Sequence, residues 1–485
     1  MTEPDGAAFE AAGRRVLAAL ARYLDESRAG HGPVVDLRPV VEIERDLGLV
    51  ERMRAGGLEG DLEGFLAAYL ASTTRMHHPG YFCHQVAVPH AIGALGDLVH
   101  GLTNNPMAMY EMGPAAVACE LAALDWMLER VGWPRGRRPG APPGGPPCGA
   151  GVLTHGGSLA NLTALLAARA AAAPEAWDEG TPRDLVVLAP RPAHYSIARA
   201  VSILGLGSRA LRPIAVDEAE VLCPDALAPA CREARDRGLR IMAVVANACA
   251  TSTGLYDPLE EVGRFCREEG LWLHVDGAHG ASALASPRER ARLRGVEHAD
   301  SLVWDAHKML RTPTLCTAVL FRDGRAFDRA FEEEASYLFY GDGENRDGPD
   351  LIHRTVECTK AGLGLKLFFS LAAQGEAGLA AYIEGRVDAA RRFAERIRAR
   401  PGFACPFEVQ SNIVCFRHGQ DVGAAGDARQ ISIRDALVRE GRFHPSSTTV
   451  GGRRYLRLAV MSPATDEGTI EALLDEIERI ARERT

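Results

Sequence analysis

Between residues 151 and 321, short runs of mainly apolar residues alternate with longer stretches rich in Ala, Arg and Glu. The apolar runs are GVLT, DLVVLA, IMAVVANA, LWLHVD, SLVWD and LCTAVLF. A strand with one face in solvent alternates apolar and polar residues, whereas a strand covered on both faces is apolar throughout. The pattern therefore predicts an α/β fold in which helices cover both faces of a mostly parallel sheet built from βαβ units.

The two ends of the chain carry different patterns. Near the N-terminus, FEAAGRRVLAALARYLDE and DLEGFLAAYLAS have apolar residues three and four apart, which predicts helices. Toward the C-terminus, helical stretches such as TIEALLDEIERI alternate with the strand-like runs SNIVCFRH and YLRLAVMSP. The domains we expect are an N-terminal helical segment (1–100), a large α/β domain (101–370) and a small α+β domain (371–485).

The composition indicates what kind of molecule the protein binds and in which cellular compartment it works. The chain has 485 residues and a formal net charge of -9, so it has no broad basic surface for nucleic acid or an anionic membrane. Its N-terminus lacks the long uncharged core of a signal peptide or membrane span. Its 11 cysteines form no CxxC pair, which indicates reduced core thiols rather than disulfides or a zinc ribbon. We therefore expect a cytoplasmic protein that acts on a small metabolite.

Polar groups follow five of the predicted strands. In an open α/β sheet, ligands bind beyond the carboxyl ends of the strands, where loops and helix N-termini converge. The groups are HGGS after GVLT, His194 after DLVVLAP, the hydroxyl-rich CATSTG after IMAVVANA, Asp276 after LWLHV, and Asp305, His307 and Lys308 after SLVW. We expect these groups to meet at one edge of the sheet.

Each group alone also has an ordinary structural explanation. Ser158 could cap a helix whose turn the two glycines permit, or the same free amides could bind a phosphate. His194 could be a hydrogen-bonded structural histidine. Asp276 and Lys308 could form a buried ion pair, because each needs a partner if it is desolvated.

Together, however, the groups fit one cofactor, pyridoxal 5'-phosphate. Its aldehyde requires a lysine, its pyridine nitrogen a carboxylate, its ring a flat neighbour and its phosphate free amides. A competing interpretation takes His274, Asp276 and His279 of HVDGAH as ligands of a divalent metal. His279 lies in a turn beyond Gly277, so the spacing does not make these side chains converge, and we predict no metal.

The ordered set LTHGGSLANLTALLAAR, AHYSIARA, TSTGLYDPL, WLHVDGAHG, ADSLVWDAHKML and RTVECTKAGLGLKLF resembles the group II pyridoxal-phosphate-dependent amino acid decarboxylases. The resemblance runs from HHPGYF at residue 77 to LRLAVMSP near residue 462. It implies a fold-type-I, aspartate-aminotransferase-like enzyme with a seven-stranded sheet. It also implies a homodimer with the active site at the subunit interface.

The resemblance further implies roles for individual residues. Lys308 would form the Schiff base, Asp276 would face the pyridine nitrogen, and His194 would stack on the ring as a catalytic residue. The other residues expected at the cofactor are Gly157, Ser158 and His307 at its phosphate, Ala278 against the ring, and Thr251.

In this family the proton delivered to Cα is attributed to a tyrosine on a mobile loop. The corresponding stretch, ASYLFYGDGENRDGPDLIHRT, is polar and glycine-rich, as expected of a lid. Tyr340 is a better candidate for this acid than Tyr337, which lies in the part that ordinarily precedes the loop. A purely structural role for Tyr340 is the alternative.

Four positions depart from the usual pattern of the family. Cys249 and Ala250 stand where many members have Gly and Thr, which removes a hydroxyl near the cofactor. Gly277 replaces an alanine after the aspartate, and Ala306 replaces the proline before His307. None of these changes removes a group that the chemistry requires.

The expected reaction is decarboxylation of an L-amino acid to its amine and CO2, which makes the protein a carboxy-lyase. His84 and Gln85 are polar where an enzyme selective for aromatic substrates would place rings. This favours a small polar or acidic substrate, namely glutamate, aspartate, cysteine sulfinate or 2,4-diaminobutyrate. The alternatives are decarboxylation of an aromatic amino acid, a transaminase or aldehyde-forming enzyme on the same scaffold, and a non-catalytic or metal-dependent protein.

Overall fold

The computed structural model describes residues 5–136, 147–331 and 348–483. By its internal contacts the chain divides into two compact units. Unit 1 comprises Met1–His84, Asp388–Pro406 and Asn412–Thr485, and unit 2 comprises Gln85–Val387 and Phe407–Ser411. The N-terminal segment thus shares a unit with the C-terminal part of the chain, and the domain boundaries expected at residues 100 and 370 stay predictions.

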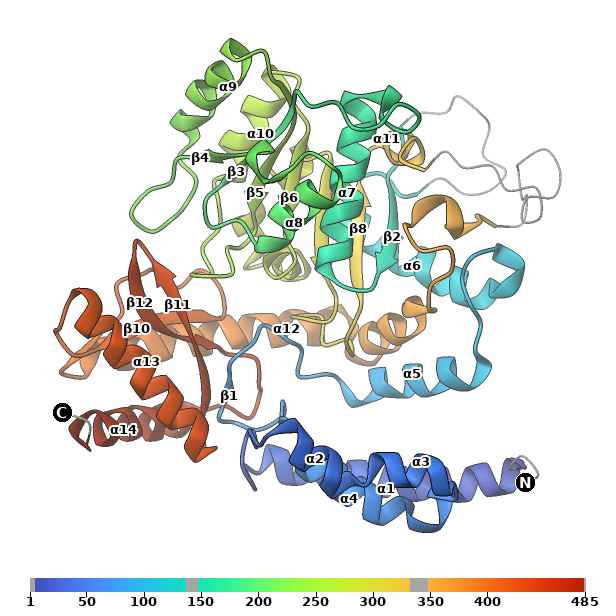
Figure 1. The fold of residues 1–485 in the computed structure, drawn as a ribbon, viewed down its shortest axis with the longest axis vertical. Helices are drawn as coiled ribbons and strands as arrows, with labels where there is room; N and C mark the ends of the chain where they lie inside the picture. The colour runs from blue at the N-terminus through green and yellow to red at the C-terminus, as the bar shows by residue number, and fades with distance from the viewer. Residues whose placement is uncertain (1–4, 137–146, 332–347, 484–485) are drawn as a thin grey trace. The chain divides into compact units, whose positions relative to one another are not determined.

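Unit 2 contains a seven-stranded sheet of order β2-β8-β7-β6-β5-β3-β4 (Figure 1). The strands are β2 (Ala150–Thr154), β3 (Leu185–Pro190), β4 (Leu211–Ile214), β5 (Arg240–Asn247), β6 (Leu273–Asp276), β7 (Ser301–Asp305) and β8 (Thr317–Phe321). Strand β8 is antiparallel to both of its neighbours, and the other pairs are parallel. The mostly parallel seven-stranded sheet is confirmed, and each of the apolar runs forms one of its strands.

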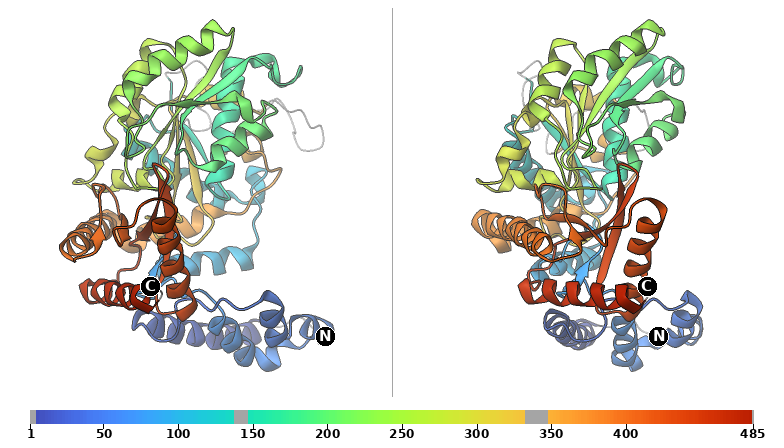
Figure 2. Two further views of the ribbon diagram at one scale, coloured as in Figure 1. Left: turned by 60° about the vertical axis from the view of Figure 1, so that its left-hand side comes forward. Right: turned by 90° about the vertical axis from the view of Figure 1, so that its left-hand side faces the viewer.

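Helices cover both faces of this sheet, which explains why its strands are apolar throughout. In β7, Val303 belongs to a buried cluster with helix α7 (Gly157–Ala172). The next residue, Trp304, points to the opposite face, where its ring lies 5.9 Å from that of Trp126 on α6 (Pro114–Val131). Figure 2 shows the strands between helical layers.

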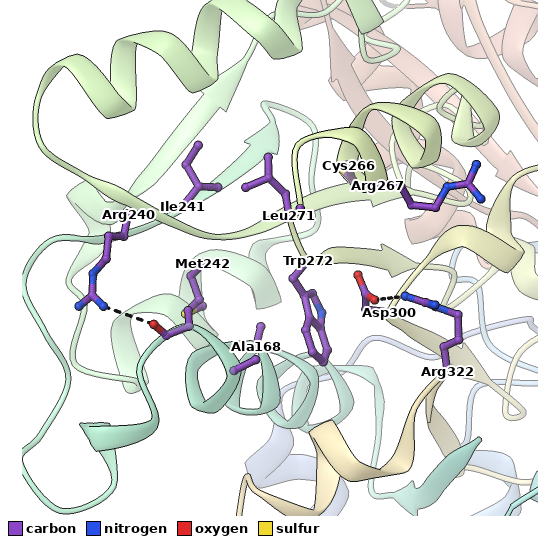
Figure 3. Close-up of a pocket in the computed structure, with 13 residues that line it drawn as sticks. Ala168, Arg240, Ile241, Met242, Cys266, Arg267, Leu271, Trp272, Asp300 and Arg322 are labelled. Carbon is purple, nitrogen blue, oxygen red and sulfur yellow. Dashed lines mark hydrogen bonds and ion pairs between the residues drawn. The ribbon is translucent and has the colours of Figure 1, made fainter. Parts of the chain in front are cut away.

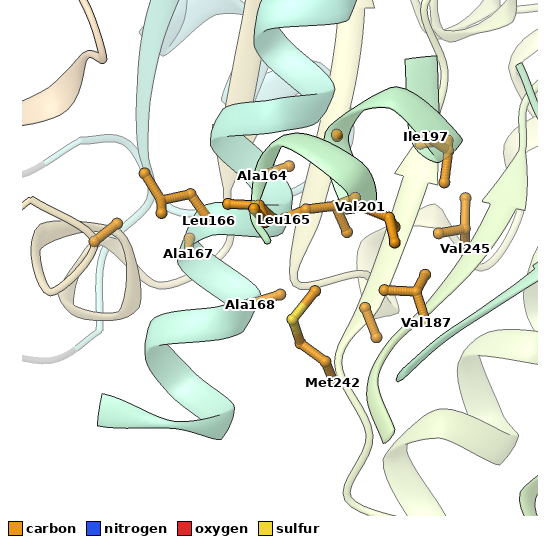
Figure 4. Close-up of a cluster of buried hydrophobic side chains, with 14 of the residues drawn as sticks. Ala164, Leu165, Leu166, Ala167, Ala168, Val187, Ile197, Val201, Met242 and Val245 are labelled. Atoms are coloured by element: carbon orange, nitrogen blue, oxygen red, sulfur yellow. The ribbon is translucent and has the colours of Figure 1, made fainter. Parts of the chain in front are cut away.

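The α7 face of the sheet holds the apolar cluster of Figure 4. Ala164, Ala167 and Ala168 of α7 are fully buried, and their small side chains let the helix lie close to the strands. Helix α8 (Tyr195–Ile203) adds Ile197 and Val201 to the same cluster. The N-termini of both helices are thereby held at the carboxyl edge of the sheet.

The remaining helices of unit 2 connect or flank the strands. They are α5 (Ala91–Thr103), α9 (Leu227–Asp236), α10 (Leu259–Glu268), α11 (Gly324–Asp328) and the first part of α12 (Leu363–Ala399). Gly375 interrupts the helical geometry of α12 with a φ of 64°, a left-handed value that favours glycine.

Unit 1 combines a five-stranded sheet with helices, as expected for the C-terminal part. Its strands are β1 (Tyr81–Phe82), β9 (Phe403–Ala404), β10 (Ile413–His418), β11 (His444–Val450) and β12 (Arg453–Ala459), in the order β1-β11-β12-β10-β9. Its helices are α1 (Gly6–Arg28), α2 (Val40–Leu47), α3 (Leu49–Ala55), α4 (Leu62–Ala71), α13 (Gly423–Glu440) and α14 (Glu467–Glu483).

The N-terminal segment, for which we expect helices, also contains one short strand. Strand β1 pairs in parallel with β11, so that Tyr81 lies opposite His444. A two-residue strand has too short a pattern to be recognised without its partner. All 11 cysteines are free. Within the described ranges, no helix has both the length and the apolarity needed to cross a membrane.

The apolar cluster of Figure 4 permits a test on one helix. Ile197 is fully buried in α8, whereas Ile203 at the end of the same helix is 62% exposed. We expect Ile197→Ala to lower the free energy of unfolding by about 2–5 kcal/mol, because it leaves a cavity. The control Ile203→Ala should change it by less than about 0.5 kcal/mol. Urea unfolding followed by circular dichroism measures both, and equal losses would contradict the assigned packing.

Candidate active site

A cavity of about 170 Å³ lies at the carboxyl edge of the unit 2 sheet. It is lined by Gly157, Ser158, Asn161, His194, Asn247, Cys249, Thr251, Asp276, Ala278, His279, Asp305, His307 and Lys308. Asn247, Asp276 and Asp305 are the last residues of neighbouring strands β5, β6 and β7. The structure thus brings together every residue predicted at the cofactor from the sequence. Tyr337 and Tyr340 lie outside the described residues.

The ammonium group of Lys308 is held by Asp305. Lys308 Nζ lies 3.0 Å from Asp305 Oδ2, and Thr317 donates a hydrogen bond of 2.6 Å to Asp305 Oδ1. Burial pushes the pKa of the Asp305 carboxyl upward, but Lys308 and His307 outweigh burial, so the net pKa is lowered. Asp305 is therefore an ionised group that keeps the lysine nitrogen inside the cavity.

Asp276 has different partners. Its Oδ2 accepts a hydrogen bond of 3.0 Å from Asn161 Nδ2, and its Oδ1 accepts one of 3.2 Å from the backbone N–H of Ala278. Among the described residues Asp276 makes no ion pair with Lys308, so the ion pair considered from the sequence is wrong. The two residues line the same cavity from the ends of different strands.

The N-terminus of α7 opens toward this cavity. Gly156 is the N-cap residue and has a φ of 103°, which only glycine adopts readily, and no side chain caps this end of the helix. Ser158 lies inside the first turn, so the interpretation of Ser158 as the cap is wrong. The first N–H groups of a helix have no partner within it, and they form an anion-binding site where no side chain satisfies them.

His194 is the N-cap of α8 and keeps its ring at the cavity. Its Nδ1 accepts a hydrogen bond of 3.3 Å from the Ser196 N–H and lies 2.7 Å from Ser196 Oγ. Burial is the main cause that lowers the pKa of His194, and Lys308 lowers it further. The imidazole is therefore neutral, and because Nδ1 acts as an acceptor, its proton is on Nε2.

His274 is fully buried behind Asp276 and uses both ring nitrogens. Its Nε2 lies 2.9 Å from Asn161 Oδ1 and its Nδ1 lies 2.9 Å from Ser301 Oγ. Burial lowers its pKa to about 4, so the ring is neutral. Within the described part of the chain, the group with suitable metal-ligand spacing is Glu260, Glu297 and His298, not the HVDGAH set.

The sequence does not predict the two side chains that bind Lys308 and Asp276, namely Asp305 and Asn161. The sequence shows that Asp305 is charged but not what it binds, because its contact with Lys308 depends on how the turn after β7 folds. Asn161 lies within the largely apolar helix that follows HGGS, where a single polar residue carries no motif. Its position was a usable signal, since it lies four residues after Gly157 and therefore on the same face of α7.

A second cavity, of about 520 Å³, lies at the amino ends of the parallel strands, opposite the candidate active site (Figure 3). It is bordered by the starts of β5 and β6 and includes Trp272. Arg240 and Arg322 at its rim are already in ion pairs with Asp184 and Asp300. Its lining contains no lysine and none of the predicted site residues, so the smaller cavity is the candidate active site.

Residues 58–419 match the family described as the pyridoxal-dependent decarboxylase conserved domain. The chain belongs to this family. Its cofactor is therefore pyridoxal 5'-phosphate, and its reaction class is that of a carboxy-lyase.

Similar proteins cover nearly the whole of this decarboxylase. The acidic amino acid decarboxylase of Bos taurus is 27% identical over 93% of this chain and 86% of its own length. The cysteine sulfinic acid decarboxylase of Rattus norvegicus is 29% identical over 86% of this chain and 85% of its own. The L-2,4-diaminobutyrate decarboxylase of Acinetobacter baumannii is 25% identical over 96% and 91%.

Solved structures share the fold. The crystal structure of mouse CSAD has a TM-score of 0.88 and 26% identity, and the match covers 99% of each chain. The crystal structure of Oryza sativa TDC with PLP and tryptamine also has a TM-score of 0.88, at 24% identity, over 100% of this chain and 99% of that one. The fold-type-I architecture is confirmed.

The neutral state of His274 predicts a pH dependence of stability. Its pKa is about 4 when folded against 6.5 as the ordinary value, so only the unfolded chain gains this proton as the pH falls below 6.5. The contribution of the neutral His274 ring to the free energy of unfolding is complete above pH 6.5. Below pH 6.5 it decreases by up to about 1.4 kcal/mol per pH unit. His274→Gln lacks this contribution. The gap in unfolding free energy between wild type and variant, measured in urea, should shrink from pH 6.5 to 5 and stay constant from pH 7 to 8.

Proposed function

We propose that this enzyme removes the α-carboxylate of an L-amino acid with an acidic or small polar side chain, at the cavity around Lys308. The observation that carries the proposal is the arrangement of two buried carboxylates. Asp305 holds Lys308, while Asp276 bonds to Asn161 and Ala278 and faces the same cavity. An amine and a separate carboxylate are therefore available to different ends of one ligand.

The lining residues fit pyridoxal 5'-phosphate. Lys308 would bind its aldehyde carbon, and Asp276 would face its ring nitrogen. The free end of α7, at Gly157 and Ser158, would hold its phosphate together with His307. The neutral ring of His194 would stack on the pyridine, with Ala278 and Thr251 at other parts of the cofactor.

When bound, this cofactor supplies an electron sink for the bond between Cα and the departing carboxylate. The protein residues create the environment in which this occurs. Asp305 keeps Lys308 Nζ within the cavity, and Asp276 would present its carboxylate to the ring nitrogen. His194 contributes a flat, uncharged surface with its proton on Nε2. Tyr340 remains our candidate for the acid that protonates Cα.

The substrate class is supported from two directions. The relatives are named for acidic amino acids, cysteine sulfinic acid and 2,4-diaminobutyrate. Gln85 is buried, and its amide Nε2 has no hydrogen-bond partner among the described residues. The nearby Ala87 N–H donates to the carbonyl of His307, which places this segment beside the lysine turn. An unpaired amide donor there suits a substrate side chain that carries an acceptor.

We also propose that the enzyme is a cytoplasmic homodimer with its active site at the subunit interface. The family resemblance supports the dimer. The 11 free cysteines are consistent with a reducing compartment.

A direct test is to incubate the purified protein with pyridoxal phosphate and a mixture of the standard amino acids, 2,4-diaminobutyrate and cysteine sulfinate. We expect the amine of an acidic or small polar amino acid, and no product from Lys308→Ala. Borohydride reduction should leave the pyridoxyl group on Lys308, as identified by peptide mass spectrometry. An aromatic amine would contradict the substrate class, and aldehyde or keto acid products would favour the other reactions on this scaffold.

The role of Asp276 can be tested separately. We expect Asp276→Asn to retain cofactor but to lower kcat about 100-fold, because the fixed charge at the ring nitrogen is lost. Asp300→Asn is a matched control, since Asp300 accepts from the backbone N–H of Leu273 at the other end of β6. The control should keep kcat within about twofold, because Asp300 does not line the cavity around Lys308. Unchanged turnover in Asp276→Asn would rule out its assigned role.

A further inference from the structure

Asn161 uses both polar atoms of its side chain although it is only 1% exposed. Its Nδ2 donates to Asp276 Oδ2 at 3.0 Å and to Ser196 Oγ at 2.8 Å. Its Oδ1 lies 2.9 Å from His274 Nε2. The side-chain amide of this one residue on α7 therefore binds the last residue of β6, the first turn of α8 and His274 within β6.

The direction of every hydrogen bond in this network can be derived. The nitrogen of Asn161 donates to Asp276, so its oxygen faces His274 and can only accept a hydrogen bond there. His274 therefore carries its proton on Nε2, and its Nδ1 accepts from the hydroxyl of Ser301. The hydroxyl of Ser196 accepts from Asn161 and donates to His194 Nδ1.

The series of hydrogen bonds continues along the sheet to the amino ends of its strands. Trp272 Nε1 donates to Ser301 Oγ at 3.0 Å, so Ser301 both accepts and donates. Trp272 is one of the residues that line the cavity of Figure 3. A continuous series of bonds thus runs from Trp272 through Ser301, His274 and Asn161 to Asp276, and each member has one compatible orientation.

We propose that Asn161 is a positioning residue that fixes the plane of the Asp276 carboxylate for the ring nitrogen of the cofactor. The inference rests on the proposed cofactor site. Asn161 acts through Asp276 and has no freedom to rotate, because turning its amide would break three bonds to buried groups. An apolar residue of similar size would leave Asp276 Oδ2 and the proton of His274 Nε2 unpaired, and the carboxylate would turn toward another donor.

A comparison of two cofactors separates positioning from general packing. 1-Deaza-pyridoxal phosphate has carbon in place of the ring nitrogen, so it gains nothing from a correctly oriented Asp276. The measured quantity is the ratio of its Kd to that of pyridoxal phosphate, obtained by equilibrium dialysis of reconstituted full-length protein. Asn161→Leu should lower this ratio about tenfold through weaker binding of pyridoxal phosphate alone. A purely structural role would weaken both cofactors equally and leave the ratio unchanged.

Asn412→Leu is the matched control. Asn412 is also 1% exposed and donates to the carbonyl of Val460, within unit 1. The same substitution there should leave the cofactor ratio unchanged, even if the melting temperature falls. An equal decrease of the ratio in both variants would overturn the proposal.

His274 provides a second pair of variants if Asn161→Leu does not fold. His274→Leu removes the donor that holds Asn161 Oδ1 and should also lower the ratio. His274→Gln retains both a donor and an acceptor and should restore it toward the wild-type value. An unchanged ratio in His274→Leu would overturn the proposal while leaving the proposed function intact. Absence of saturable binding of pyridoxal phosphate by the wild type would overturn both.

Discussion

The site depends on how one partly buried amine, Lys308, is paired with only one of two buried carboxylates, Asp305 and Asp276. Asp276 and Asp305 end the adjacent parallel strands β6 and β7, so the backbone sets their separation. Lys308, in the turn after β7, pairs with Asp305. Asp276 is satisfied instead by an amide side chain and a backbone N–H. This division leaves a charged group on each of two sides of the cavity.

Because both carboxylates are buried, each of them needs its own hydrogen-bond donors. A carboxylate removed from water needs donors, because its desolvation costs several kcal/mol if it is left unpaired. Asp305 meets this need with the ammonium of Lys308 and the hydroxyl of Thr317, whereas Asp276 relies on neutral donors. Neutral donors orient a carboxylate without cancelling its charge. Asp276 is therefore left without a cationic partner among the described residues, as a site for a pyridine nitrogen requires, and Lys308 has its own counterion in Asp305.

The sequence was most informative where the physical signal was local. Continuous apolar runs predicted the seven-stranded sheet, and the polar residues that end those runs predicted the cavity, because parallel strands bring their carboxyl ends together. Strand β1 escaped prediction because two residues gain a strand conformation only by pairing with β11. Asp305 and Asn161 were missed for a related reason. Their roles follow from partners on other elements, such as Lys308 and His274, whose geometry no local pattern specifies.

His194 and His274 show how far the positions of protons are determined by neighbouring groups. Their neutral state follows first from burial, which disfavours a second proton on an enclosed ring. The nitrogen that keeps the single proton is then set by hydrogen-bond partners. For His274 these partners are Ser301, which accepts from the indole of Trp272, and Asn161. For His194 the partner is Ser196, which accepts from Asn161. If that amide were reversed, its oxygen would face Asp276 and its nitrogen would face the protonated Nε2 of His274, so two contacts would become repulsive at once. The orientation of the Asp276 carboxylate is in this way coupled to hydrogen bonds that begin at Trp272, at the amino end of β6.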